Sequence, residues 1–457
     1  MRTNTLLFRI LLPIIIAAAL SACNLKLPLD VKEKEASKPI SFAKFFEAPT
    51  PEVKKTKKYP SADPRLAKIL ASPLLQASEQ SIAASKKAVS VVDAQREPLI
   101  SGNSNVGPRL SDEKSLDFEA TAGVSVNKIV RDGGALDALT EAANLNVKTS
   151  QLIYMQNINS QLLQVLRAEQ SILNFENVSK MYDEQLAIYE ENIPLIDAAV
   201  KANVISKSEA LKLEQLKIRS QEQFLIAKTA ADAAQIVRNK FGLNGSDKFF
   251  KLDLESWKSA EKKLETRALP GLQLLDTRAT LIEKDIAGIQ ATFDPKVLMA
   301  GSATANFIDK DNSIGFFGFN ITLPFKDGGK RKYEIEEKNL QIAVVVQQKE
   351  EAKVVNLTAF KTLENFDVLY AGRVKLLDAQ IENSEVIAAD LELKLRAGAV
   401  SVADLATEKM NYYDLRNQKI ALDYQRISEI LKFYETIELG CELANLCSQV
   451  EEVAQVE

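Results

Sequence analysis

Cys23 is the first residue whose surroundings point to a definite chemistry. In this chain of 457 residues it follows directly after Leu20-Ser21-Ala22, at the end of an apolar run over residues 11–20. A run of this length behind a short basic segment is typical of a signal peptide and is too short to span a bilayer. Small residues before the cysteine match a bacterial lipobox, so we predict lipidation of the Cys23 thiol after removal of residues 1–22. The alternative is an ordinary signal peptide with an incidental cysteine.

The residues after Cys23 bear on its destination. In well-studied envelope sorting systems an aspartate at the next position holds a lipoprotein in the inner membrane, so Asn24 favours the outer membrane. Residues 23–62 are rich in Lys, Glu and Pro and lack periodicity, which predicts an extended tether. No later segment has enough consecutive apolar residues for a transmembrane helix.

Cys441 and Cys447 are the two remaining cysteines, and they lie six positions apart near the chain end. In an oxidising periplasm they could form a disulfide that closes a small loop. They could equally stay unpaired, and the sequence leaves both possibilities open.

Several residue types and motifs needed for catalysis are missing. Histidine, the most frequent general base and metal ligand, is absent. There is no nucleophile elbow, no cluster of metal ligands and no glycine-rich phosphate loop. A net charge of −4 gives no reason to expect nucleic acid as a partner. We therefore expect neither an enzyme nor a bound cofactor or metal.

Two separated motifs recur at one offset. Val130 to Gly134 resembles Phe325 to Gly329, and Lys201 to Ser206 resembles Arg396 to Ser401, each pair being 195 positions apart. A shared offset implies that the residues between the two motifs of one half align without gaps with those of the other half. We therefore predict that the chain contains an internal duplication. We predict a first repeat over 63–245, a connector over 246–269, a second repeat over 270–440 and a C-terminal tail over 441–457.

Each repeat is expected to contain a helix, two strands and then two long helices, which makes the chain mainly α with β. The first repeat places strands at about 98–130 and long helices at about 135–242, and the second places them at about 295–325 and 330–438. Apolar residues recur at helical spacing along the long segments. Helices of such length require coiled-coil-like packing against neighbours.

The Asp-Gly-Gly segments lie where the strands end and the long helices begin. An aspartate can cap the following helix, and two glycines permit a tight passage from strand to helix. We interpret these residues as architectural: Asp132, Gly133, Gly134, Asp327, Gly328 and Gly329.

The strand patterns favour a membrane barrel built from several chains. Leu116 to Val126 and Phe317 to Leu323 alternate apolar and other residues, as strands of outer-membrane barrels do. The same alternation also describes hairpins on a soluble core. Four strands cannot close a barrel, and an open edge is not tolerated in lipid. Three copies would supply twelve strands, so a cyclic homotrimer is the natural closure.

Apolar residues also fall at the predicted turns between the long helices. These are Val204, Ile205, Ala399 and Val400, the last two following Gly398. Apolar side chains at an exposed tip suggest a surface that docks a partner. They could instead pack inside the turn.

The order of these elements resembles the TolC-like outer-membrane factor family. The resemblance covers about residues 63–440 and includes the segment from Gly398 to Leu405, which is similar to the family's periplasmic tip. It implies a trimer with a twelve-stranded outer-membrane barrel continued by a periplasmic helical barrel. It also implies export of small molecules or polypeptides, with a periplasmic adaptor and an inner-membrane ABC or proton-driven transporter as partners.

The resemblance further implies a role for acidic residues at the tip. By position Asp404 matches an aspartate that rings the aperture in some family members, and Glu209 is its counterpart in the first repeat. Three copies of a carboxylate around a narrow opening would attract cations. The family's second aspartate falls at Thr407, so this chain departs from the pattern. Either acid could instead stabilise the N-terminus of the returning helix.

Two other classes of protein share some of these features. A periplasmic adaptor has a lipobox and a helical hairpin, but only one hairpin flanked by small β-rich domains. A lipid-anchored coiled-coil structural protein would explain the helices but not the duplicated strand pairs.

Overall fold

The computed structural model describes residues 63–110, 116–203, 205–245, 247–264, 269–307 and 314–455. The predicted signal peptide, Cys23, the tether and Val204 lie outside these ranges. The described chain divides into a sheet unit, residues 95–133 and 294–324, and a helical unit formed by the rest.

The sheet unit is a four-stranded antiparallel sheet in the order β1-β2-β3-β4. Its strands are β1 (Leu99–Leu110), β2 (Leu116–Arg131), β3 (Lys296–Asn306) and β4 (Ile314–Thr322). β2 and β3 come from different repeats and pair with each other, with a register shift between Ile129 and Arg131. β1 and β4 are therefore the edges of the sheet, and among the described residues each lacks a neighbour on one side.

The helical unit contains two long helices of equal length. α4 (Ala135–Lys201) and α8 (Lys330–Arg396) each have 67 residues, which corresponds to about 100 Å. Its other elements are α2 (Pro64–Leu70), α3 (Pro73–Ala94), α5 (Lys207–Lys240), the 3-10 helix η2 (Ser256–Ser259), α6 (Glu261–Leu264), α7 (Pro270–Ala291), α9 (Val402–Thr436), α10 (Gly440–Leu443) and α11 (Cys447–Gln455). The duplicated arrangement of helix, strand pair and long helices is confirmed.

The 195-residue offset extends to the backbone conformation of the turns. Gly134 and Gly329 precede α4 and α8 with φ of 94° and 88°. After these helices, Asn203 and Gly398 adopt φ of 56° and 73°. Both pairs lie in the left-handed region, which favours glycine and is tolerated by asparagine. The chain thus reverses at equivalent positions in the two repeats.

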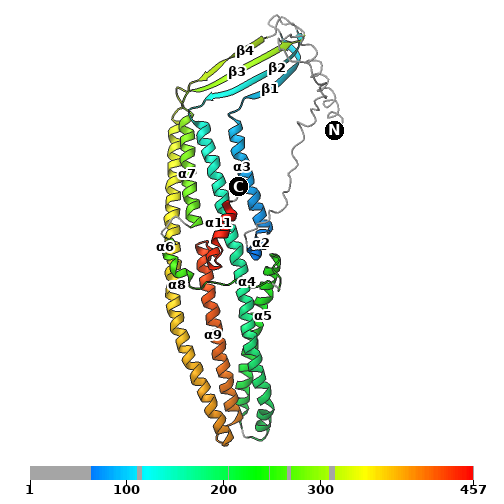
Figure 1. Ribbon diagram of the computed structural model, residues 1–457, viewed down its shortest axis with the longest axis vertical. Coiled ribbons are helices and arrows are strands. Elements are labelled where there is room, and N and C mark those ends of the chain that lie inside the picture. Colours follow the sequence, from blue (N-terminus) through cyan, green and yellow to red (C-terminus); the bar gives the residue numbers. More distant parts are fainter. Residues whose placement is uncertain are drawn as a thin grey trace. The chain divides into compact units, whose positions relative to one another are not determined.

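The helices pack side by side in a fixed order (Figure 1). α4 contacts α3 and α5 as well as α7 and α9, whereas α8 packs mainly against α7 and α9. The column formed by α3 and α5 and the column formed by α8 are therefore at opposite edges of the unit. No helix among the described residues is long and apolar enough to cross a bilayer.

The main hydrophobic core lies at the middle of the helical unit. It joins side chains of α2, α4, the connector, α9 and the C-terminal helices. Residues 441–455, which the sequence presents as a tail, form most of α10 and all of α11 and contribute Leu443, Val450 and Ala454 to this core. The C-terminal segment is thus an integral part of the packing.

Candidate functional surfaces

The tip of each hairpin begins its returning helix with the same capping arrangement. In α9 the Ser401 Oγ accepts from the Asp404 N–H at 3.1 Å, and the Asp404 Oδ2 accepts from the Ser401 N–H at 3.0 Å. Ser206 and Glu209 form the equivalent capping box at α5. This reciprocal bonding satisfies two helix N–H groups. Asp404 and Glu209 therefore stabilise helix N-termini through one carboxylate oxygen each.

Removing one cap should loosen the start of α9. We expect Ser401→Ala to cost about 1 kcal/mol, because the Asp404 N–H loses its acceptor. Hydrogen exchange of the first turn of α9 should accelerate by several-fold. Ser428→Ala is a matched control, since the Ser428 hydroxyl donates only to the Tyr424 carbonyl within the same helix. Equal exchange in wild type and Ser401→Ala would contradict the capping role.

An apolar cluster joins the two hairpins near their tips. Ile205 is only 8% exposed and packs in this cluster with Ile196, Leu213, Ala403 and Met410. Its side chain is therefore inside the turn and does not form an outer docking surface. In the second tip Gly398 and Ala399 are exposed and Val400 is half-buried, so these three residues retain the accessibility that a docking surface requires.

Polar links between the hairpins lie next to this cluster. The buried Gln185 side chain of α4 accepts from the Ser220 hydroxyl of α5 and from the Asn417 amide of α9. Arg416 pairs with Glu184 at 3.5 Å, and Arg219 pairs with Asp414 at 3.6 Å. Buried polar groups that satisfy each other fix the relative register of packed helices. These contacts hold α9 against α4 and α5.

A buried ion pair lies in the central core. Glu169 of α4 and Arg238 of α5 are almost fully inaccessible and approach to 3.4 Å, and the Glu169 carboxylate also accepts from the Phe250 N–H at 2.8 Å. Burial raises the pKa of Glu169, while the Phe250 N–H and the Arg238 guanidinium oppose that shift. The pair connects two helices of the first repeat to the connector.

The C-terminal segment is closed by a disulfide between Cys441 and Cys447. The Cys441 N–H donates to the Asn159 side chain of α4 at 2.8 Å. Gly440 packs so closely that an added Cβ would lie 2.5 Å from the Leu163 side chain. The seven-residue loop is thereby held against α4.

Loss of this disulfide should destabilise the packing of α10 and α11. Chain-entropy arguments for so short a loop give about 2 kcal/mol. We expect Cys441→Ser/Cys447→Ser to become sensitive to proteolysis within residues 441–455 while the sheet unit stays resistant. Reduced wild-type protein should behave in the same way, and unchanged resistance in both would show that packing alone holds the segment.

The Asp-Gly-Gly turn before α8 contains two hydrogen bonds from the backbone to its own aspartate. The Asp327 carboxylate accepts from the Gly329 and Arg331 N–H groups, both at 2.9 Å. These bonds lower the pKa of Asp327. The stabilisation they supply is therefore present at neutral pH and is lost only as the pH falls through the lowered value. Asp132 occupies the corresponding position in the first repeat.

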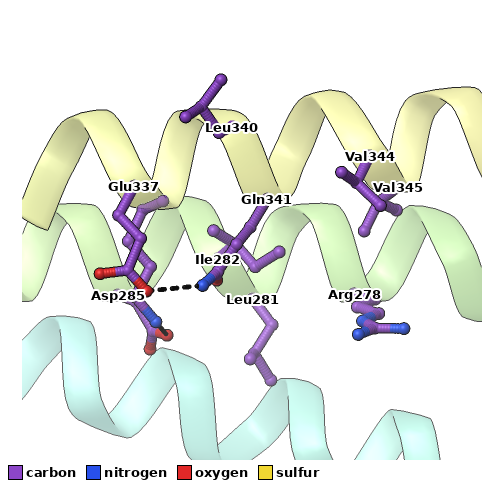
Figure 2. A pocket seen from close by; sticks show the side chains of 10 residues that line it. Arg278, Leu281, Ile282, Asp285, Glu337, Leu340, Gln341, Val344 and Val345 are labelled. Carbon is purple, nitrogen blue, oxygen red and sulfur yellow. Dashed lines mark hydrogen bonds and ion pairs between the residues drawn. The ribbon is translucent and has the colours of Figure 1, made fainter.

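Grooves along α8 show that this helix is incompletely covered. Figure 2 shows the groove between α7 and α8, which has a volume of about 450 Å³. Two polar contacts lie in this groove: the Lys338 ammonium pairs with the Asp285 carboxylate at 2.7 Å, and the Gln341 amide donates to the Glu337 carboxylate at 3.1 Å. Leu340 points away from α7 and is exposed. Apolar side chains of α7 and α8 also line the groove. No group of three or more potential metal ligands occurs among the described residues.

The register of the sheet separates an apolar face from a polar face. Paired positions point to the same side, so Ile100, Val126, Gly301 and Phe317 share one face. Val124, Met299, Phe319 and Ile321 follow on that face. The opposite face carries Ser101, Asn103, Ser125, Asn127, Ser302 and Thr304, and the hydroxyls of Ser101 and Ser125 lie 2.7 Å apart.

In the part of the chain that the structure describes, side chains on both faces of the sheet are exposed. Phe317 and Phe319 are exposed on the apolar side. Phenyl rings cover glycines on each face, Phe317 over Gly301 and Phe316 over Gly318. This aromatic packing stabilises positions that have no side chain of their own. An uncovered apolar face and an uncovered polar face are what a wall between lipid and water requires.

Solved structures with this arrangement are outer-membrane channels. CusC, which forms a transmembrane channel, matches with a TM-score of 0.66 and 13% identity over 82% of this chain and 91% of its own. The open MtrE channel of Neisseria gonorrhoeae matches with a TM-score of 0.67 and 15% identity, over 82% and 88%. The chain has the fold of TolC-like outer-membrane channels.

CmeC of Campylobacter jejuni extends the likeness to most of the molecule. This outer-membrane channel matches over 93% of the present chain and 98% of its own, with 13% identity and a TM-score of 0.64. No protein-family model and no curated protein matches the sequence. The shared feature with these TolC-like channels is therefore the fold, and what the chain does must be argued from its own surfaces.

Sequence reasoning did not find the buried ion pair or the Gln185 contacts. A signal for the ion pair was present. Glu169 continues the apolar spacing of Leu162, Val165 and Leu166, and Arg238 continues that of Ala227, Ala231 and Ala234. A charged residue within an apolar stripe must find a buried partner.

Proposed function

We propose that this protein is a trimeric outer-membrane channel and has no enzymatic activity. The observation that carries the proposal is that the sheet is incomplete in two ways, with two unlike free edges and two uncovered faces of opposite polarity. Further copies joined through β1 and β4 would remove the edges, and closure would place the apolar face toward lipid and the polar face toward water.

The helical unit supports the same closure independently. Its free edges are also unlike, the α3 and α5 column at one side and α8 at the other. Each carries exposed apolar side chains, including Leu211, Leu225 and Ile236 on α5 and Leu369, Leu376 and Leu393 on α8. Unlike edges that join in a head-to-tail manner form a ring. Three copies with four strands each would give a twelve-stranded barrel.

The remaining parts of the proposal concern membrane attachment and partners. A lipid on Cys23 would anchor the chain in the bacterial outer membrane. Gly398, Ala399 and Val400 would contact a periplasmic adaptor, and an inner-membrane ABC or proton-driven transporter would supply energy for the export of small molecules or polypeptides. Asp404 of each copy would lie near the periplasmic aperture with one carboxylate oxygen outside the capping box, and Glu209 would have the equivalent place in the first repeat.

Native mass spectrometry of protein extracted from outer membranes tests the assembly. We expect a particle of three chains, each carrying the mass of acyl groups at its N-terminus. Cys23→Ser should lose the acyl mass but still form trimers. A monomer from extracts in which the sheet is protease-resistant would contradict the proposal.

A further inference from the structure

The segment Phe325–Tyr333, here called the basic turn, has an unusual concentration of positive charge. It carries Lys326, Lys330, Arg331 and Lys332 and one acid, Asp327. Because the Asp327 carboxylate already accepts from two backbone N–H groups, it is committed to the turn itself. The basic turn therefore has a net positive charge that its own acid only partly offsets.

The fold does not require these cations. The first turn of α8 contains no acidic residue, although the positive end of a helix dipole favours acids and disfavours cations. In the first repeat the equivalent segment, Val130–Ala138, has one cation and two acids and starts a helix of the same length. Residues that oppose a local structural preference, and that the fold does not need, are expected at functional positions.

The cations of the basic turn are available to a ligand. Lys330 and Lys332 are 73% and 72% exposed, and they form only long surface pairs with Glu334 and Glu336 at 3.6 and 3.9 Å. Exposed ion pairs of this kind contribute little to the free energy of folding. The Arg331 guanidinium stacks on the Phe293 ring at 4.1 Å, which orients its donors without neutralising its charge.

Exposed aromatic rings accompany the cations. Phe325 is 92% exposed and Tyr333 is 65% exposed. Aromatic and basic residues occur together where a protein meets the boundary between lipid and water. A soluble polyanion would give no reason for an exposed phenylalanine, whereas a lipid headgroup with its acyl chain accounts for both residue types.

The connectivity of the chain limits how far the basic turn can lie from the end of β4. Lys330 is eight residues beyond Thr322, the last residue of β4, so it can lie at most about 28 Å away. This step rests on the proposed function, in which the sheet spans the membrane. The basic turn is then at the level of the lipid headgroups on the side where the helices begin.

We propose that the basic turn binds the phosphate-bearing headgroups of anionic phospholipids. Lys330 and Lys332 supply point charges, and Arg331 supplies a planar fork of donors suited to phosphate oxygens. Phe325 lies beside the acyl chain. The first repeat has no equivalent site, so each protomer offers one such turn.

Lipid retention by the wild-type trimer in detergent tests this proposal. Phosphatidylglycerol or phosphatidylcholine would be added, and bound lipids counted by native mass spectrometry. We expect at least a tenfold preference for phosphatidylglycerol, lost when salt is raised to high concentration. Lys330→Gln/Arg331→Gln/Lys332→Gln should lose the preference. Millimolar glycerol phosphate should not compete, because it lacks the acyl chain.

A matched control removes three cations from elsewhere on α8. In Lys361→Gln/Lys394→Gln/Arg396→Gln the side chains also form exposed surface pairs, and the preference should remain. Equal retention of both lipids by wild-type trimers, or equal loss in both triple variants, would overturn the lipid site while leaving the channel intact. Failure to find membrane-inserted trimers at all would instead contradict the proposed function.

Discussion

Glu169→Leu is expected to lower the free energy of unfolding of the helical unit by about 3–5 kcal/mol. The substitution leaves the Arg238 guanidinium buried without its carboxylate partner and leaves the Phe250 N–H without its acceptor. Removing one member of a buried ion pair is costly because the other charge stays desolvated. Chemical denaturation followed by circular dichroism should show the loss as an earlier transition.

A double variant distinguishes loss of the pair from loss of packing. In Glu169→Leu/Arg238→Met both charges are replaced by apolar side chains, so most of the stability should return. If the double variant is as unstable as the single one, the pair itself is needed for the packing of α4 against α5. If the single variant is as stable as wild type, the buried charge is not desolvated as the structure indicates.

Leu369→Asp/Leu376→Asp is expected to abolish the trimer. These leucines are 57% and 67% exposed on α8 and lie seven residues apart on one face. Burial of a leucine at an interface contributes about 2 kcal/mol, and a carboxylate in its place would have to be desolvated. Because the same contacts recur at every interface of a ring, each interface loses this binding free energy. The extracted protein should therefore be monomeric in native mass spectrometry.

Gln347→Asp/Gln380→Asp is the matched control for this prediction. Both glutamines are exposed on α8, so the variant adds the same charge to the same helix without removing apolar surface. It should remain largely trimeric. If both variants dissociate equally, the effect is one of net charge, and if neither dissociates, α8 does not form the edge that joins the copies.

The duplication made much of the fold predictable. The Asp-Gly-Gly motifs and the tip motifs share one offset, and this offset identifies equivalent positions in the two repeats. The backbone agrees with it, because Gly134 and Gly329, like Asn203 and Gly398, adopt the same left-handed conformation. The sequence of β1 shows little alternation of apolar and polar residues, because its central residues are polar. The register explains this pattern, since Ser101 and Asn103 belong to the polar face of the sheet.

Features that depend on long-range packing could not be predicted in the same way. Whether Cys441 and Cys447 pair depends on the approach of the C-terminal segment to Asn159 and Leu163, which are far away in the sequence. Whether Ile205 is exposed depends on its contacts with the second hairpin. Local patterns identify turns and amphipathic faces, but only the packed structure shows which faces are covered.

The most direct test of the central proposal is the electrical conductance of the purified mature trimer in a planar bilayer. We expect discrete current steps, and block by a multivalent cation that weakens in Asp404→Asn if this carboxylate lies at the aperture. Current steps with unchanged cation block would support the channel but show that Asp404 does not line the aperture. Trimers that insert into the bilayer but never conduct would contradict the proposal that this chain forms a channel.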